Sequence, residues 1–175
     1  MIAHLVESVW EKNKSRVILD LGCGTGLNAP LFRPYASRLD GVDLAPRMLR
    51  QAARRGGYDH LYQAEAHAFL RRPPVRYDAI LSTDVFIYIG QLEEIFSLSC
   101  QSLNKGGEIL CTIELGSGEQ PVELRQTGRF RQTDAYIRQV AAKAGFEVAA
   151  THDDVLRAEQ DQPEPGRAYR LIRIE

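Results

Sequence analysis

The sequence has few cysteines and no cluster of side chains suited to a metal ion. Its three cysteines, Cys23, Cys100 and Cys111, are odd in number, widely spaced and outside any C-x-x-C pattern. This excludes a disulfide scaffold and fits a reducing compartment. The four histidines form no H-E-x-x-H motif and no Cys/His cluster, so we predict no metal site.

The sequence also lacks a long apolar run and an excess of charge of either sign. No stretch approaches the roughly 18 consecutive apolar residues of a membrane-spanning helix. His4, Glu7 and Glu11 interrupt the N-terminal segment, which therefore lacks the apolar region of a signal peptide. The 22 Lys and Arg residues against 23 Asp and Glu leave a net charge of −1, without the basic excess typical of a protein that binds a phosphate backbone. We predict a cytoplasmic protein with neither a membrane nor a nucleic acid as partner.

The chain is long enough and apolar enough to form a core without disulfides. It has 175 residues, 44% of them hydrophobic and 26% charged. A domain of this size buries roughly 70% of the surface of its unfolded chain. We therefore expect a single domain over residues 1–175.

Apolar runs alternate with helical patterns, which predicts an α/β domain with a mostly parallel sheet. Seven strands are expected at 16–21, 38–43, 61–64, 77–83, 108–114, 146–151 and 168–174, the last one antiparallel. Helices are expected in the N-terminal segment 1–14 and at 27–36, 46–55, 91–103 and 133–144. The N-terminal helix is inferred from the helical spacing of Ile2, Leu5, Val6 and Val9. For the last helix, Thr133 is the expected N-cap and Gly145 the stop.

The strongest local signal is L-D-L-G-C-G-T-G at residues 19–26. Its three glycines alternate directly after a predicted strand and before a helix, where glycine lets the backbone bend sharply and approach a ligand. The spacing is G-x-G-x-G, whereas G-x-G-x-x-G is typical of dinucleotide binding. Asp43 ends the next predicted strand, so its carboxylate is expected beside the glycine loop, where it can accept from both hydroxyls of a ribose. The residues therefore predict a nucleoside-containing cofactor without a diphosphate.

With G-V-D-L-A-P-R-M-L at 41–49, the glycine motif resembles the class I S-adenosylmethionine-dependent methyltransferases. Further matches are A-E-A at 64–66, Y-D-A-I at 77–80 and L-N-K-G-G at 103–107. The resemblance implies a Rossmann-like, doubly wound fold, with S-adenosylmethionine as cofactor and S-adenosylhomocysteine as product. Details at 57–59, 69–70 and 128–130 are similar to bacterial predicted methyltransferases associated with tetratricopeptide repeats, although this chain contains no such repeat.

The resemblance also implies roles for individual residues of a cofactor site. The loop beneath the methionine and ribose would consist of Gly22, Cys23, Gly24, Thr25 and Gly26. Asp20 would hold the methionine ammonium group, directly or through water, and Asp43 the ribose hydroxyls. Around the adenine would lie Leu44, Met48, Glu65 and Ala66, with Glu65 accepting from its amino group. Thr83 and Asp84 would lie beside the methionine portion and the transferred methyl group.

The residues that serve the methyl acceptor are less clearly marked. Asp84, Tyr88 and His67 are the nearest candidates for a general base or a substrate contact. The segment 115–131 is long and without periodicity, and long loops in compact domains are often functional, so we predict it to be the acceptor-site loop. Its arginines Arg125, Arg129 and Arg131 are candidates for a pocket that binds an anionic group.

Each of these residues also has a plain structural explanation. His67 and Tyr88 could serve packing alone, the three arginines could lie on a solvated loop, and Met48 could face the core. Asp20 and Glu65 could be ordinary acids at a strand end and on the surface.

The sequence favours an S-adenosylmethionine-dependent methyltransferase that acts on a small molecule by in-line transfer. The segment 82–86, S-T-D-V-F, lacks the Asn/Asp-Pro-Pro-aromatic signature of enzymes that methylate adenine or glutamine amides. The alternative is a catalytically silent, cofactor-binding accessory module that works through a partner protein. A nicotinamide oxidoreductase is disfavoured by the glycine spacing. The acceptor atom, the need for a base and the oligomeric state stay open.

Overall fold

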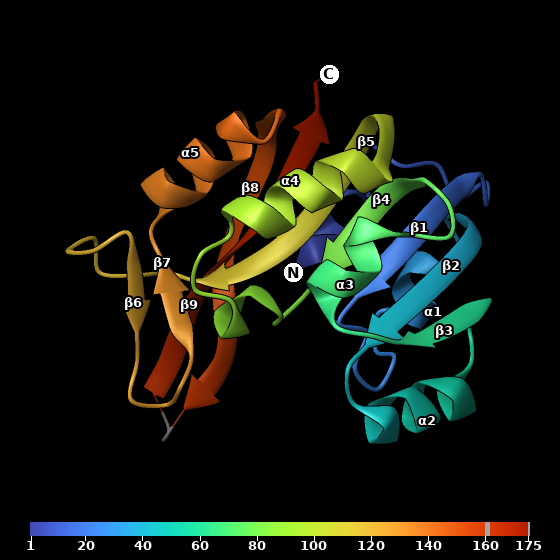
Figure 1. Ribbon diagram of the computed structural model, residues 1–175, viewed down its shortest axis with the longest axis horizontal. Helices are drawn as coiled ribbons and strands as arrows, with labels where there is room; N and C mark the ends of the chain where they lie inside the picture. The colour runs from blue at the N-terminus through green and yellow to red at the C-terminus, as the bar shows by residue number, and fades with distance from the viewer. Residues whose placement is uncertain (160–161, 175) are drawn as a thin grey trace.

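The structure of the chain, a computed structural model, describes residues 1–159 and 162–174. Seven strands form one sheet in the order β3-β2-β1-β4-β5-β9-β8 (Figure 1). The strands of this sheet are β1 (Arg16–Leu21), β2 (Ala36–Asp43), β3 (His60–Gln63), β4 (Tyr77–Ser82), β5 (Leu103–Glu114), β8 (Phe146–Glu159) and β9 (Gln162–Arg173). The first five run parallel, and β9 is antiparallel to both β5 and β8. The predicted fold class is confirmed.

Helices cover both faces of the sheet. They are α1 (Ala29–Phe32), α2 (Pro46–Arg55), α3 (Ala66–Arg71), α4 (Glu93–Ser102) and α5 (Asp134–Lys143), with short 3-10 turns η1 (Ile2–Leu5) and η2 (Phe86–Tyr88). The core on one face contains side chains from α3, α4 and α5, and the core on the other face contains side chains from η1 and α1. None of the described helices is long and apolar enough to cross a membrane.

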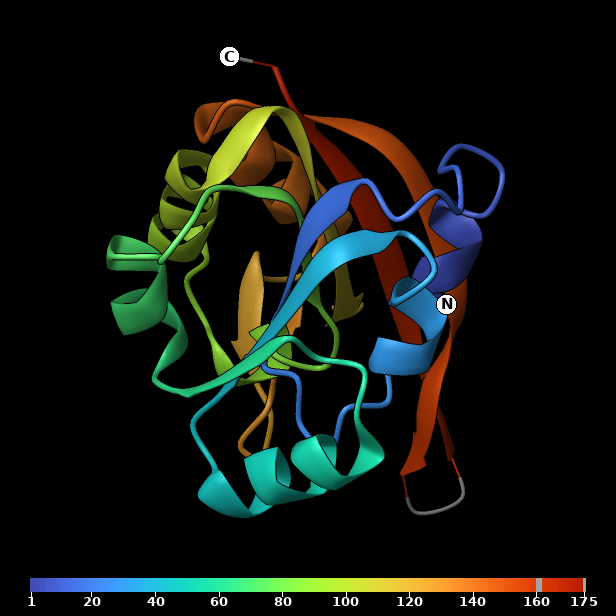
Figure 2. The same ribbon diagram turned by 90° about the vertical axis from the view of Figure 1, so that its right-hand side faces the viewer.

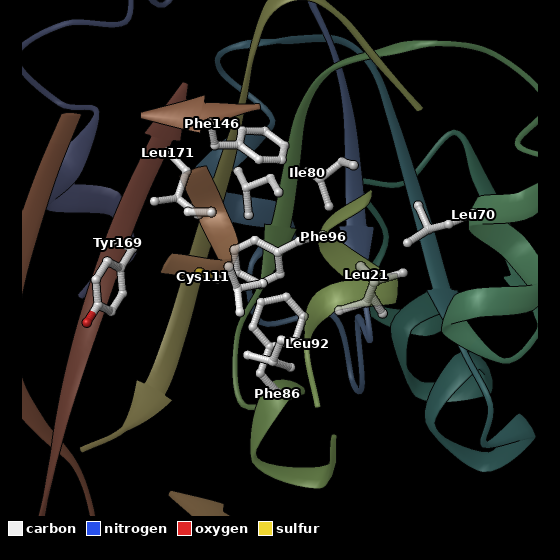
Figure 3. Close-up of a cluster of buried hydrophobic side chains, with 14 of the residues drawn as sticks. Leu21, Leu70, Ile80, Phe86, Leu92, Phe96, Cys111, Phe146, Tyr169 and Leu171 are labelled. Carbon is white, nitrogen blue, oxygen red and sulfur yellow. The ribbon is translucent and has the colours of Figure 1, made fainter. Parts of the chain in front are cut away.

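The strands are apolar on both sides because each face of the sheet carries a core. Ile109 and Cys111 of β5 point into the cluster beneath α4 and α5, whereas Leu110 between them points into the opposite cluster. Figure 3 shows the larger cluster, in which Phe96 of α4 lies among side chains from the sheet such as Leu171. Because both sides of these strands are buried, their sequences are continuous apolar runs and do not alternate between apolar and polar residues.

Helices with clear start and stop signals lie where they were predicted. The helix expected at 46–55 is α2, which begins at Pro46 and ends before Gly56. Thr133 is the N-cap of α5, and its side chain accepts from the N–H of Tyr136 at 3.2 Å. The helix expected at 27–36 is reduced to the four residues of α1, because Pro34 lies just after it and β2 begins at Ala36. The sequence reading missed α3, which is only six residues long.

The prediction of a helix over 1–14 is wrong. Only η1 is helical, and turns follow it as far as Val9. Val9, expected on the buried face, is 51% exposed, and Trp10 is buried instead. Figure 2 shows this segment against the long strands β8 and β9. An isolated helix of about 14 residues is only marginally stable in water. In this segment the backbone path is therefore set by the burial of individual side chains, such as Trp10, against the sheet.

Two segments without a predicted element contain strands. Within 115–131 the chain forms β6 (Val122–Leu124), which pairs with β7 (Phe130–Gln132) in a small antiparallel sheet. The polar stretch 153–167 continues β8 and β9 as a long hairpin, described up to Glu159 and again from Gln162. Strands that pair mainly with each other and face solvent show no buried apolar run that sequence patterns could detect.

Trp10 fixes the N-terminal segment to the sheet, and its removal should destabilise the protein. Its indole N–H donates to Glu108 at 3.2 Å, and its ring meets Phe32 and Tyr35 edge-on. We expect Trp10→Ala to lower the free energy of unfolding by about 3–5 kcal/mol in denaturant titrations. The neighbouring control Val9→Ala should change it by less than about 0.5 kcal/mol. Similar effects of the two variants would contradict this account of the segment.

Candidate functional site

A cavity of about 700 Å³ lies at the carboxyl ends of β1, β2, β3 and β4. From β1 the chain builds the sheet outward through β2 and β3, and then returns to the other side of β1 with β4. Loops after neighbouring strands diverge at such a point and leave a crevice, where ligands of open α/β sheets bind. The cavity is lined by Gly22, Cys23, Gly24, Thr25, Leu27, Asn28, Val42, Asp43, Leu44, Ala45, Met48, Ala64, Glu65, Ala66, Thr83, Asp84, Val85, Tyr88 and Ile89.

Glycine is required in the loop after β1 for two different reasons. Gly22 has φ +74°, and a Cβ there would lie 2.3 Å from a methyl carbon of Val85, so glycine lets the loop after β4 approach. Gly24 has φ +54°, but a Cβ there would meet no atom within 4 Å. At Gly24 the backbone therefore borders the open cavity, as expected where a main chain lies close to a ligand.

Asp43, at the end of β2, holds this loop in place. One carboxylate oxygen accepts from the N–H of Gly24 at 2.9 Å, and the other accepts from the N–H of Ala45 at 2.7 Å. A carboxylate oxygen can accept more than one hydrogen bond. Asp43 thus supports the glycine loop and keeps acceptor capacity for a hydroxyl group in the cavity.

Asp20 lies behind the cavity wall rather than on it. Its carboxylate is fully buried and accepts from the Asn28 side chain at 3.0 Å and from the Tyr58 hydroxyl at 2.6 Å. Burial raises the pKa of Asp20 to about 6, although both hydrogen bonds act to lower it. Asn28 also donates to the Thr83 hydroxyl at 2.9 Å, so it joins the loops after β1 and β4 and lines the cavity in place of Asp20.

The sequence reading missed both partners of Asp20. Asn28 precedes Ala29-Pro30 at the start of α1, where an asparagine is an ordinary N-cap. Its side chain makes no cap hydrogen bond and turns to Asp20 instead. Tyr58 lies in the G-Y-D segment used for the resemblance, but nothing in its neighbours indicates a bond to a strand 38 residues away.

Asp84 has an unusual backbone conformation at the mouth of the cavity. Its φ is +57°, and its N–H donates to the Thr112 hydroxyl at 3.0 Å. A left-handed conformation in a residue other than glycine costs free energy and is often found at functional sites. The exposed Asp84 side chain lines the cavity beside Thr83.

Glu65 is the N-cap of α3 and also borders the cavity. Its carboxylate accepts from the N–H groups of His67 and Ala68 and from the His67 ring at 2.8 Å. Partial burial acts to raise the pKa of Glu65, but these hydrogen bonds outweigh it and the pKa is lowered. His67 does not line the cavity, and its contact with Glu65 gives it a structural role.

The structure brings together most of the predicted cofactor site. The predicted residues that line the cavity are Gly22, Cys23, Gly24, Thr25, Asp43, Leu44, Met48, Glu65, Ala66, Thr83, Asp84 and Tyr88, whereas Asp20, Gly26, His67, Arg125 and Arg129 do not. Burial raises the pKa of the Cys23 thiol to about 12, so this cysteine is protonated and unreactive at neutral pH. Met48 is 41% exposed and faces the cavity rather than the core. Among the described residues, no group of three or more potential ligands is arranged to hold a metal ion.

The arginines of segment 115–131 do not form the predicted pocket for an anionic group. Arg125 and Arg131 both contact Glu164, at 2.9 and 2.5 Å, and both lie within 4 Å of Glu114. Glu114 and Glu164 are buried, and a buried carboxylate is stable only when it is paired. These guanidinium groups are therefore used by the fold, and Arg129 lies outside the cavity.

Comparison with known proteins relates this chain to methyltransferases. The family described as a methyltransferase domain matches residues 1–151. A tRNA1(Val) (adenine(37)-N6)-methyltransferase from Yersinia enterocolitica is 33% identical over 78 residues, which is 39% of this chain and 31% of that protein. The chain thus aligns with less than half of the length of this curated relative.

Two solved structures show the same fold. An S-adenosylmethionine-dependent methyltransferase from Mesorhizobium loti is 18% identical, with a TM-score of 0.75 over 97% of this chain and 96% of that one. Magnesium protoporphyrin IX methyltransferase from Synechocystis PCC 6803, crystallised with bound S-adenosylmethionine, is 18% identical, with a TM-score of 0.73 over 98% of this chain and 76% of that one.

The raised pKa of Asp20 predicts a pH-dependent difference between the protein and an Asp20→Asn variant. A folded-state pKa of about 6, against 3.8 for an ordinary aspartate, means that ionisation of Asp20 destabilises the fold as the pH rises from about 4 to above 6. Asparagine does not ionise. The free energy of unfolding of the variant minus that of the wild type should therefore increase by about 2–3 kcal/mol over this range. Urea titrations at pH 4, 5, 6 and 7 measure it, and a constant difference would contradict the assignment.

Proposed function

The chain belongs to the methyltransferase-domain family, and from this membership we propose that it binds S-adenosylmethionine in the cavity at the carboxyl ends of β1, β2, β3 and β4 and transfers the methyl group to a small molecule. The observation that carries the proposal is the combination at one cavity of an open glycine backbone at Gly24 with a carboxylate at Asp43. Both features fit an adenosine, which offers a flat ring and two vicinal hydroxyl groups.

The lining residues match the parts of the cofactor. Asp43 would accept from the ribose hydroxyls, and the exposed apolar side chains of Leu44 and Met48 would cover the adenine. Asn28 and Thr83, joined by their hydrogen bond, offer polar atoms for the amino-acid end. A cavity of about 700 Å³ lies within the roughly 300–1,000 Å³ typical of small-molecule sites.

Catalysis at this site requires positioning more than charge stabilisation. When bound, S-adenosylmethionine supplies an activated methyl group, because the electron pair of the breaking C–S bond returns to a positively charged sulfur. The chain must then hold a nucleophile within about 3–3.5 Å of the methyl carbon and in line with the sulfur. Asp84 and Tyr88 lie at the mouth of the cavity, where they could orient an acceptor and, at Asp84, take a proton from it.

Three observations favour a small molecule over a nucleic acid. The net charge is −1, the segment 82–86 lacks the signature of adenine-methylating enzymes, and no lysine or arginine is among the described residues that line the cavity. Nucleic-acid binding depends mainly on basic contacts to phosphates. The Yersinia tRNA methyltransferase resembles this chain over 78 residues only.

Asp43 provides a direct test of cofactor binding. Asp43→Asn removes the negative charge and replaces one acceptor oxygen with a donor, so it should weaken binding of S-adenosylhomocysteine by about 10- to 100-fold. Isothermal titration calorimetry measures the dissociation constant. The exposed control Asp154→Asn, outside the cavity, should leave that constant unchanged. Equal affinities of the wild type and Asp43→Asn would remove Asp43 from the site.

Methyl transfer should be detected with labelled cofactor. We expect the purified chain to transfer a radioactive methyl group from S-adenosylmethionine to the small-molecule fraction of a bacterial extract, and not to total tRNA from the same extract. Scintillation counting of the separated fractions measures both. Labelled tRNA would overturn the small-molecule proposal. Cofactor binding without transfer to any fraction would favour the accessory module instead.

A further inference from the structure

A second cavity of about 730 Å³ lies next to the cofactor cavity. Tyr88 and Ile89 line the first cavity, and the chain continues directly into Gly90 and Gln91, which line the second. The remaining lining residues come from α4, the β6–β7 hairpin with the two residues before it, and α5, namely Glu93, Gln120, Pro121, Val122, Phe130 and Tyr136. Figure 1 shows the hairpin and α2 on opposite sides of η2. The sequence predicted an acceptor-site loop at 115–131, and this segment forms one wall of the second cavity.

Specific contacts build the polar corner of the second cavity. The Tyr136 hydroxyl accepts from the N–H of Leu92 at 2.8 Å and donates to the carboxylate of Glu93 at 3.0 Å. The phenol of Tyr136 is buried, whereas Glu93 is exposed. The hydroxyl therefore orients the Glu93 carboxylate, which keeps free lone pairs toward solvent and the cavity.

The apolar wall of this cavity is an aromatic ring held in place by its neighbours. A Cβ at Gly90 would lie 2.8 Å from the Phe130 ring, so glycine allows the ring to lie directly against the backbone. Gln132, two residues after Phe130 in β7, is buried. Its side-chain amide donates to the carbonyl groups of Phe86 and Ile89 at 3.1 and 3.0 Å. The hairpin that carries Phe130 is thereby fixed to the segment between the two cavities.

The described residues that line the second cavity include an acidic side chain and no basic one. Glu93 is the only described lining residue with a carboxylate. The nearby arginines Arg125 and Arg131 contact the buried Glu164. An anion would meet the negative Glu93 there, whereas a cation would find a carboxylate and the aromatic ring of Phe130, a kind of side chain that attracts positive charge.

We propose that the second cavity binds a cationic group, an ammonium or alkylated ammonium, of the methyl acceptor, with Glu93 and Phe130 as the specificity-determining residues. This inference rests on the proposed function, because it assigns the substrate class of the same site. The cationic group is an anchor rather than the methylated atom, since it binds beside the cofactor cavity and not in it. The acceptor is then a molecule with a positive charge at one end and a nucleophilic atom near Asp84 and Tyr88.

Three probes that differ only in their end group can test the proposal. They are 3-phenylpropylammonium, 3-phenylpropanoate and 3-phenylpropan-1-ol, each titrated into isotopically labelled protein saturated with S-adenosylhomocysteine. The amide resonances of Gly90, Gln91 and Val122 locate binding in the second cavity. We expect the ammonium probe to bind at least about tenfold more tightly than the carboxylate probe.

Variants assign the preference to individual side chains. Glu93→Gln keeps the length of the side chain and an oxygen that can accept from Tyr136, and it should weaken the ammonium probe about tenfold while leaving the alcohol unchanged. Phe130→Leu should weaken the ammonium probe about two- to fivefold. The control Glu94→Gln changes the neighbouring acid, which pairs with Arg71 outside the cavity, and should have no effect.

Two results would overturn the proposal. One is equal binding of the ammonium and carboxylate probes, or no binding of the ammonium probe at these resonances. The other is an unchanged affinity for the ammonium probe in Glu93→Gln, with melting temperature and S-adenosylhomocysteine affinity equal to those of the wild type. Failure of the wild type to bind S-adenosylhomocysteine in the initial titration would contradict the proposed function instead, so the two failures are distinct.

Discussion

The hydrogen bond from the N–H of Gly24 to the carboxylate of Asp43 ties two neighbouring parallel strands together at the edge where they end. Because β1 and β2 are in register, the last residue of β2 lies beside the loop that follows β1. Asn28 makes the corresponding connection on the other side, from Asp20 of β1 to Thr83 after β4. These two connections fix the loops after β1, β2 and β4 around the crevice at the switch of strand order, and so set the position of the glycine loop.

Charged groups in this protein are divided between support of the fold and contact with ligands. Arg125 and Arg131 reach buried carboxylates on β5 and β9, and so attach the segment 115–131 to the sheet. Because those guanidinium groups are paired, they leave the wall of the second cavity without positive charge. Pairing of buried acids is required by the cost of an isolated buried charge. A structural requirement thereby sets the charge of this wall.

Local patterns predicted more of the residues that line the first cavity than of the contacts around the second. The glycine turn and the acid at the end of a strand are local features. Each can be recognised from the residues directly around it in the sequence. The burial of Asp20 behind the cavity wall could not be predicted, because Asn28 and Tyr58, which enclose its carboxylate, belong to other segments of the chain. The pair of Glu93 and Tyr136 joins the starts of two helices 43 residues apart. No spacing rule indicates such a contact, since it arises only when α4 and α5 pack side by side.

The sequence by itself determined the α/β class, the places of strands β1 to β5 along the chain, and the place of the glycine loop. Apolar runs and helix signals such as Pro46 and Thr133 are local properties of the sequence. They indicate strands and helices without reference to distant parts of the chain. Tertiary structure decided the path of residues 1–14, the hairpin at 122–132, the extensions of β8 up to Glu159 and of β9 from Gln162, and the partners of the buried charges. Those features depend on which surfaces meet after the sheet has formed, where the burial of Trp10 or the pairing of Glu164 outweighs weak local preferences.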